Sequence, residues 1–248
     1  MNLLASALVI WRLYSQGLHR NYRYFLGYLA FSVARTLALF PFSPRDPIYH
    51  QIWTLTQPLI WLSYLLVVAE LYALVLGHYR GIYSIGRWFF FGAVFLAVVI
   101  SGLTVLPALT NEFALPDRPL QRIYYAFIER GVVTSLAIFL FLLLAFVAWF
   151  SVPLSSNLLK HCVFYSVYFF ANNVIMLYWT AASGTSYVVT VSRLLVGFAC
   201  LVCWVLFLSR RGEDRIASLH LGRNALAERK LLTQLEDLNA TLLRTARK

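Results

Sequence analysis

The chain has 248 residues, of which 60% are hydrophobic and only 12% are charged, and its mean hydropathy is +0.70. Soluble globular domains carry about 25% charged residues, so this composition excludes an ordinary soluble domain and is typical of a protein embedded in a lipid bilayer. The net charge of +11 could suggest a nucleic-acid partner. Most basic residues, however, lie in the carboxyl-terminal tail or in short connections between apolar segments. That distribution indicates membrane topology and no nucleic-acid binding.

The amino-terminal segment, residues 2–16, is apolar but reaches Arg12 early. No basic run precedes it and no small-residue cleavage site follows, so a cleaved signal peptide is not expected. We predict a short first helix that Trp11 and Arg12 anchor at a membrane interface. If this helix spans the membrane the protein has seven spans, and if it lies along the inner interface the protein has six.

The remaining apolar segments each approach the length that a helix needs to cross about 30 Å of hydrocarbon. The predicted spans cover residues 2–16, 24–40, 52–76, 88–106, 131–150, 161–181 and 187–209, and residue 120 is the alternative start of the fifth helix. The clearest is 52–76, which has no basic residue and a single acid, Glu70. We therefore predict an all-α integral membrane protein, with a helical bundle over residues 1–209 and a cytoplasmic amphipathic helix over 210–248.

The charge of the connections alternates along the chain. Those after the first, third and fifth predicted spans carry Arg or Lys and no acid, whereas acids and bases balance after the second and fourth. By the positive-inside rule, the amino terminus is then outside and the tail is in the cytoplasm. The expected location is the cell membrane, inner or plasma.

The tail is charged and rich in leucine. Leu231, Leu235, Leu238 and Leu242 step by four, three and four residues, as in a coiled-coil seam. This spacing predicts that residues 213–248 pair with a second copy or dock a protein partner. The alternative is a single amphipathic helix lying on the anionic inner leaflet.

Glu70 and Arg35 are the clearest charges inside the predicted spans. Thr56, Ser63 and Glu70 are spaced by seven and share a helix face, so the carboxylate is expected to face other helices. Charges at that depth require a partner, and a Glu70–Arg35 latch would provide one. The alternatives are a ligand or proton role and snorkelling to the interface.

Three arginines fall in the outer half of their predicted spans: Arg35, Arg130 and Arg193. Together with Glu70, Asn172 and Asn173 they form the candidate ligand site, because guanidinium groups bind carboxylate or phosphate through paired donors. The alternative is that each arginine binds a nearby carbonyl or a lipid phosphate and that the asparagines bridge helices. The pocket requires these helices to be neighbours.

The sequence contains no catalytic motif and no acid or histidine cluster with metal-ligand spacing, so no enzyme activity, cofactor or metal is expected. The layout resembles the multi-helix membrane input modules of bacterial sensors. The polar face of the third span, the outer arginines and the leucine seam favour a receptor-like, sensor or scaffold protein that binds a small or lipidic ligand in the bundle and self-associates or docks a partner through its tail. The alternatives are a small-solute or proton-coupled transporter that uses Glu70, and a non-catalytic subunit of a larger membrane complex.

Overall fold

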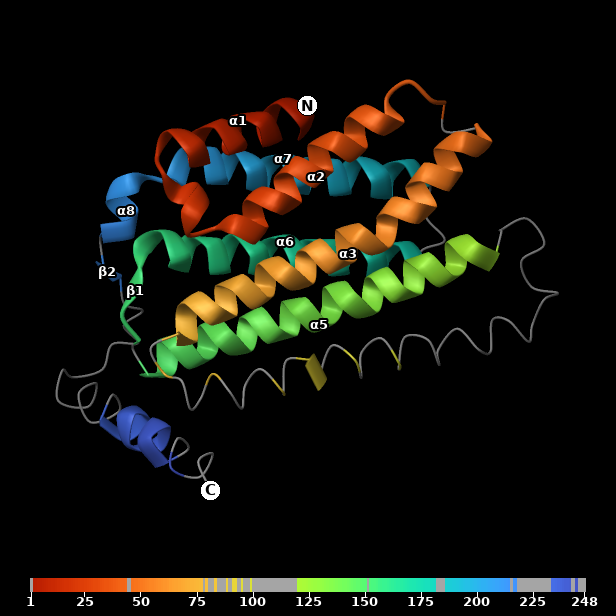
Figure 1. Ribbon diagram of the computed structural model, residues 1–248. Helices are drawn as coiled ribbons and strands as arrows, with labels where there is room; N and C mark the ends of the chain where they lie inside the picture. The colour runs from red at the N-terminus through yellow and green to blue at the C-terminus, as the bar shows by residue number, and fades with distance from the viewer. Residues whose placement is uncertain are drawn as a thin grey trace. The chain divides into compact units, whose positions relative to one another are not determined.

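The computed structural model describes residues 2–43, 46–77, 79, 83, 88, 91, 92, 95, 99, 120–150, 152–181, 186–214, 216–217, 233–241 and 244. In this part of the chain the protein is almost entirely helical (Figure 1). The helices are α1 (Asn2–Ser15), the 3-10 turn η1 (Leu18–Arg20), α2 (Arg23–Leu39), α3 (Pro47–Leu76), α5 (Leu120–Phe150), α6 (Ser156–Ala181), α7 (Ser186–Phe207) and α8 (Arg210–Asp214). Two short strands, β1 (Leu154–Ser155) and β2 (Ile216–Ala217), pair antiparallel. The predicted all-α fold is confirmed.

The chain divides into two compact units. The first comprises Met1–Val75, Pro153–Phe164 and Thr190–Ser218, and the second comprises Leu76–Val152, Tyr165–Val189 and Leu219–Lys248. Within the first unit, α1 packs against α2 (Figure 1). Residues 210–218, the beginning of the predicted tail, belong with the first unit. The boundary between a bundle and a tail at residue 210 remains a prediction.

Three helical segments are long and apolar enough to cross a membrane: Pro47–Leu76, Ile128–Phe150 and Tyr187–Phe207. They correspond to the third, fifth and seventh predicted spans. The 14 residues of α1 extend only about 21 Å, and the 17 of α2 about 25 Å. Of the predicted span 88–106, residues 88, 91, 92, 95 and 99 are helical, and the others lie outside the described residues.

Two helices begin earlier than the apolar runs suggested. α3 begins at Pro47 rather than at residue 52, because proline suits the first helical position, where its missing N–H is not needed. Asp46 precedes it, and its carboxylate accepts a hydrogen bond from the Ser43 N–H at 2.7 Å. α5 begins at Leu120, the earlier of the two predicted starts, since its helix continues through the charged residues before the apolar run. After α1, Gly17 has a φ of 71° and lets the chain turn into η1.

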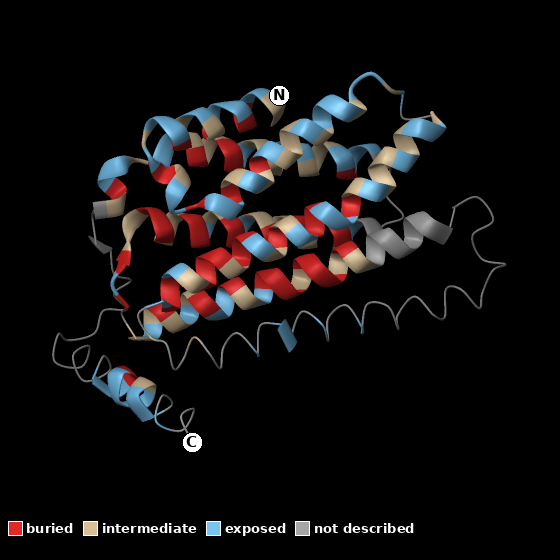
Figure 2. Ribbon diagram, viewed as in Figure 1, coloured by how far each residue is buried: buried red, intermediate tan, exposed pale blue. Residues whose placement is uncertain are grey.

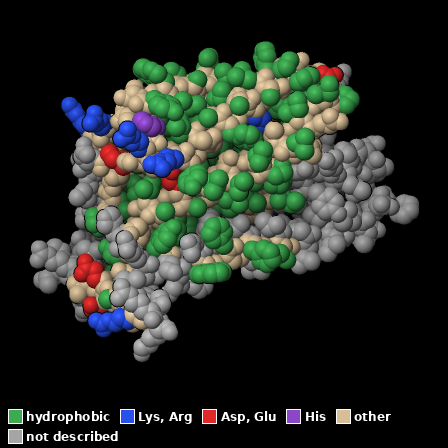
Figure 3. Space-filling model, in the orientation of Figure 1, with side chains coloured by type: hydrophobic (Ala, Val, Ile, Leu, Met, Phe, Trp, Pro, Cys, Tyr) green, Lys and Arg blue, Asp and Glu red, His purple; other side chains and the backbone are tan. Residues whose placement is uncertain are grey.

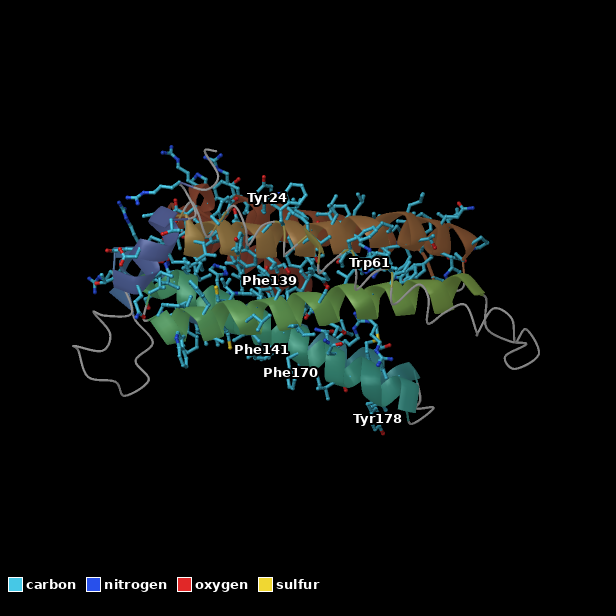
Figure 4. All side chains as sticks on the ribbon, turned by 90° about the horizontal axis from the view of Figure 1, so that it is seen from below. Tyr24, Trp61, Phe139, Phe141, Phe170 and Tyr178 are labelled. Atoms are coloured by element: carbon cyan, nitrogen blue, oxygen red, sulfur yellow. The ribbon has the colours of Figure 1, made fainter. Side chains whose placement is uncertain are left out.

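The helices expose many large apolar side chains and bury several polar ones among an apolar core. Figure 2 shows buried and exposed residues along the same helices. On α3, Leu55, Leu59, Leu62 and Leu66 form an exposed stripe, and Figure 3 shows hydrophobic side chains over much of one face. On α5 and α6, Phe141, Phe170 and Tyr178 are exposed, and the first two rings meet edge to face at 5.8 Å (Figure 4). The buried polar residues include Gln57, Glu70, Ser135, Asn157, His161, Ser166 and Asn172. A soluble helix shows the opposite arrangement, with its polar face outward.

Candidate functional site

A polar network surrounds Glu213, on α8, where the chain leaves α7. One carboxylate oxygen, Oε1, accepts a hydrogen bond from Asn21 Nδ2 at 3.1 Å. The other, Oε2, accepts from the Tyr22 hydroxyl and from Asn157 Nδ2, both at 3.1 Å. We call these four residues the Glu213 clamp. The clamp joins the connection before α2, the first turn of α6 and the beginning of the tail.

Asn157 is the buried centre of the clamp, with 0% of its surface exposed. Besides its bond to Glu213, Nδ2 donates to the Ser209 carbonyl at 2.7 Å, and Oδ1 accepts from the Ser209 N–H at 3.4 Å. The backbone of Gly212 passes so close that a Cβ atom there would overlap Asn157 Oδ1. The network therefore requires a glycine at position 212.

Aromatic rings support the clamp from within the first unit. The buried Tyr22 ring lies 4.4 Å from the ring of His161, which also meets Phe25 edge to face at 4.8 Å and Trp204 at 6.0 Å. Burial raises the pKa of Tyr22 above its usual range, and the nearby Glu213 carboxylate raises it further. The Tyr22 hydroxyl therefore stays protonated at neutral pH and can donate its hydrogen bond to Glu213.

Two cations close the carboxyl end of α7 beside the clamp. Arg12 Nε donates to the Leu208 carbonyl at 2.9 Å, and Lys160 Nζ donates to the Phe207 carbonyl at 3.1 Å. A helix carries partial negative charge at this end and its last carbonyls lack helical partners, so both contacts are favourable. The end of α1 and the first turn of α6 are thus fastened to the point where the tail begins.

Glu70 caps the amino terminus of α2. Its two carboxylate oxygens accept hydrogen bonds from the backbone N–H groups of Tyr24 at 3.0 Å and Phe25 at 3.1 Å. Only 9% of the Glu70 surface is exposed. A carboxylate at this position satisfies N–H groups of the first turn and complements the positive end of the helix dipole. The structure thus gives Glu70 an architectural role between α3 and α2.

Arg35 lies toward the other end of α2, where its Nη2 donates to Gln57 Oε1 on α3 at 2.8 Å. The helix rises about 15 Å between Phe25 and Arg35. Glu70 and Arg35 therefore connect α3 to α2 at two different levels. The described contacts support these two separate links rather than the predicted Glu70–Arg35 latch.

The six predicted ligand-site residues fall in both units. Arg35, Glu70 and Arg193 belong to the first unit, and Arg130, Asn172 and Asn173 belong to the second. In the second unit, Asn173 Oδ1 accepts a hydrogen bond from Thr134 Oγ1 on α5 at 2.6 Å, as the helix-bridging alternative predicts. Asn172 Nδ2 bonds within its own helix to the Tyr168 carbonyl at 2.8 Å. A shared anion pocket remains a prediction.

The predicted leucine seam is described only in part. Leu235 is 0% exposed and Leu238 is 49% exposed, whereas Leu231 and Leu242 lie outside the described residues. Residues 233–241 are helical. In the same unit, burial raises the pKa of Tyr79, three residues after the end of α3, and the Glu236 carboxylate raises it further.

Sequence reasoning did not find Asn21, Tyr22, Asn157, Gly212 or Glu213. The predicted topology could have indicated their proximity, because it places the connections after the first, fifth and seventh predicted spans on the same side of the membrane. Uncharged polar residues in those connections were candidates for mutual contact. No motif marks them, since hydrogen bonds between asparagine, tyrosine, glutamate and backbone groups need no fixed spacing in the sequence.

Among the described residues, no group of three or more His, Cys, Asp or Glu side chains could hold a metal ion. The sequence matches no family model, no curated protein and no solved structure.

Proposed function

We propose that the chain is a non-enzymatic, receptor-like sensor or scaffold of the cell membrane, which conveys the state of a helical bundle to its cytoplasmic tail. The Glu213 clamp is the observation that carries this proposal, because one carboxylate holds the beginning of the tail against the ends of two helices. The bundle has seven spans, or six with a peripheral α1, and binds a small or lipidic ligand.

The outward apolar faces support the membrane location. Exposed stripes of large apolar residues on α3 and α6 are expected where lipid replaces water as the solvent. The clamp supports the predicted topology as well. It brings together the connections after the first, fifth and seventh predicted spans, which share the cytoplasmic side if the spans alternate with the amino terminus outside.

The geometry of the clamp suits the transmission of small movements. Its three hydrogen bonds are each 3.1 Å long, and such bonds are lost beyond about 3.5 Å. A displacement of about 1 Å at the start of α2 would therefore break the bonds from Asn21 and Tyr22, and one at the start of α6 would break the bond from Asn157. The attachment of the tail depends on the positions of both helices, as an element with two states requires.

The contacts of Glu70 favour a sensor over a proton-coupled transporter. A coupling carboxylate must exchange a proton with water or substrate during transport. Glu70 instead is buried, and both of its oxygens accept hydrogen bonds from the backbone of α2. Protonation would weaken the cap and loosen the junction between α2 and α3.

The exposure of α7 favours a second candidate, a non-catalytic subunit of a larger membrane complex. The apolar segment Tyr187–Phe207 is much less buried than the corresponding parts of α3 and α5, and exposes Tyr187, Leu194, Leu195, Leu206 and Phe207. A partner helix could cover this face. Purification with a second protein at fixed stoichiometry would favour the subunit, and a chain that purifies alone in mild detergent would contradict it.

The tail provides the proposed output by docking a partner or by self-association through residues 213–248. Leu235 is fully buried within a single copy of the chain. Pairing of two tails through this leucine therefore requires the tail helix to leave its place. Release of the tail and formation of the predicted seam are accordingly coupled in this proposal.

The first prediction concerns release of the tail. In detergent-purified Glu213→Gln and Asn157→Ala variants, we expect backbone amides of residues 233–241 to exchange with deuterium faster than in the wild type, because the clamp is weakened. Amides of α3 and α5 should keep their protection. Hydrogen exchange measured by mass spectrometry checks this.

Glu236→Gln, which removes a charge from the exposed side of the tail helix, is the control and should leave the exchange rates unchanged. Equal tail exchange in all four proteins would contradict transmission through the clamp.

The second prediction concerns the ligand. A ligand at a hundred times its dissociation constant stabilises the folded protein by about 2.7 kcal/mol, which appears as a raised unfolding temperature. We expect such a shift for a small anion or a lipid in a thermal screen, and its loss in Arg35→Ala or Arg193→Ala proteins that still fold. A screen without any shift would contradict the receptor proposal and favour the membrane subunit.

A further inference from the structure

Four exposed arginines flank the Glu213 clamp. Arg20 and Arg23 lie on either side of Asn21 and Tyr22, and the other two, Arg210 and Arg211, precede Glu213 on α8. The 3.1 Å bonds from Asn21 and Tyr22 to Glu213 hold the two pairs close together. Figure 3 shows Lys and Arg side chains gathered at this end of the molecule. We call the four arginines the arginine rim.

The positive charge of the rim exceeds the negative charge that faces it. Among the side chains that the structure describes, the neighbouring carboxylates are Glu213, within the clamp, and Glu70, whose environment includes Arg23. Both already accept hydrogen bonds from neutral donors. The negative end of α7 is also covered, because Arg12 and Lys160 bind its last carbonyls. The rim therefore presents four guanidinium groups toward the surroundings.

Exposed aromatic residues lie next to the rim. Trp11 and Tyr14 are exposed near the end of α1, and Tyr24 is exposed at the start of α2. The Tyr14 ring stacks on His19 at 4.9 Å, one residue before Arg20. Trp and Tyr favour the boundary between hydrocarbon and headgroups. These rings place the rim at the level of the lipid headgroups.

The exposed residues of α1 change from apolar to aromatic toward the arginine rim. Leu4, Leu8 and Trp11 form one exposed stripe along α1, which then leads through Tyr14 to Arg20. Apolar, aromatic and basic residues thus follow one another as hydrocarbon, interface and headgroup do across a leaflet. This order is matched by a phospholipid and not by a soluble anion, which would need the arginines alone.

We infer that the arginine rim binds the phosphate groups of anionic phospholipids while the α1 stripe contacts their acyl chains. The inference rests on the proposed membrane location and adds the class of lipid and its site. A guanidinium group offers paired donors that match phosphate oxygens. Each basic residue near an anionic leaflet strengthens binding about fivefold. Lipid bound here would touch both sides of the clamp and favour the docked tail.

The test uses the full chain in a neutral detergent, with phosphatidylglycerol or phosphatidylcholine of identical acyl chains added. We expect phosphatidylglycerol to raise the unfolding temperature and to remain bound in native mass spectra, and phosphatidylcholine to do neither. The variant R20Q/R23Q/R210Q/R211Q should lose the difference between the two lipids. The variant R223Q/R229Q/K230Q/R244Q removes the same charge from the tail and should keep it. Equal loss in both variants would overturn the rim as a site, because net charge alone would then account for binding.

Three further arms separate the possible ligands. Inorganic phosphate and glycerol phosphate should produce no shift that R20Q/R23Q/R210Q/R211Q removes at the concentration at which the lipid acts. A shift equal to that of the lipid and lost in this variant would overturn the assignment to a membrane surface. A short oligonucleotide that binds more tightly than phosphatidylglycerol would overturn it as well. If the fourfold variant does not fold, the pairs R20Q/R23Q and R210Q/R211Q and the salt dependence of lipid binding in the wild type provide the same comparison.

The experiment reads lipid binding, whereas the function proposal is tested by exchange in the tail. Suppose that the tail amides of Glu213→Gln exchange faster but the wild type shows no preference for phosphatidylglycerol. That result would reject the lipid site and retain the sensor proposal. The opposite pair of results would retain the lipid site and reject transmission through the clamp.

Discussion

Glu70→Ala is expected to lower the free energy of unfolding by about 3 kcal/mol, because two hydrogen bonds to a charged acceptor, one buried and one half-buried, are lost together. The N–H groups of Tyr24 and Phe25 would then lose the carboxylate that accepts their hydrogen bonds. The positive end of the α2 dipole would also lose its counter-charge. Equilibrium unfolding in mixed detergent micelles, followed by circular dichroism, measures the change.

The companion variant Glu70→Gln separates charge from hydrogen bonding. Glutamine keeps one acceptor oxygen, so we expect a smaller loss of about 1 kcal/mol. Glu236→Ala, an exposed acid on the tail helix, is the control and should change the stability by less than about 0.5 kcal/mol. An unchanged stability in Glu70→Ala would show that the cap does not hold α2 to α3, and the carboxylate would again be a candidate for proton coupling.

The sequence predicted the helices best where apolar runs were long. Residues 52–76 and 187–209 coincide closely with α3 and α7, because a continuous apolar stretch leaves few alternatives to a long helix. One helix start was less accurate. The predicted third span begins at residue 52, whereas α3 begins at Pro47, although proline is favoured at the first helical position. For the fifth helix, the earlier of the two starts considered from the sequence, residue 120, is the one observed.

The partners of the buried charges could not be predicted from residue types. Glu70 and Arg35 are opposite in sign and both lie in apolar segments, so a pair between them was the simplest interpretation. The structure instead gives Glu70 two backbone N–H groups, and Arg35 a glutamine. Backbone donors at a helix terminus have no signature in the sequence, and the levels of two charges depend on how far each helix extends. Asn157 and Gly212 were missed for the same reason, since one bonds to the backbone and the other is required by close approach.

Close approach makes Gly212→Ala the sharpest test of the clamp. The new methyl group would overlap Asn157 Oδ1, and Asn157 has no room to move because it is fully buried and bonded to Ser209 and Glu213. Overpacking of a buried site destabilises by about 2 kcal/mol. We expect that loss in unfolding experiments, together with faster deuterium exchange in the tail.

Gly27→Ala is the matched control, because a Cβ atom at Gly27 on α2 meets open space. Alanine there should raise the stability by about 0.5 kcal/mol.

A double-mutant cycle then decides whether the overlap with Asn157 is the cause. Asn157→Ala alone is expected to destabilise the protein by about 2 kcal/mol, since it removes the bonds to Ser209 and Glu213. It also removes the side-chain atoms that the methyl group introduced by Gly212→Ala would overlap. The double variant should therefore be no less stable than Asn157→Ala alone, so the two effects are strongly non-additive. Additive losses would mean that Gly212→Ala acts through the backbone of α8 and not through the clamp. Non-additive losses with a released tail would show that a single contact between α6 and α8 controls the attachment of the tail to the bundle.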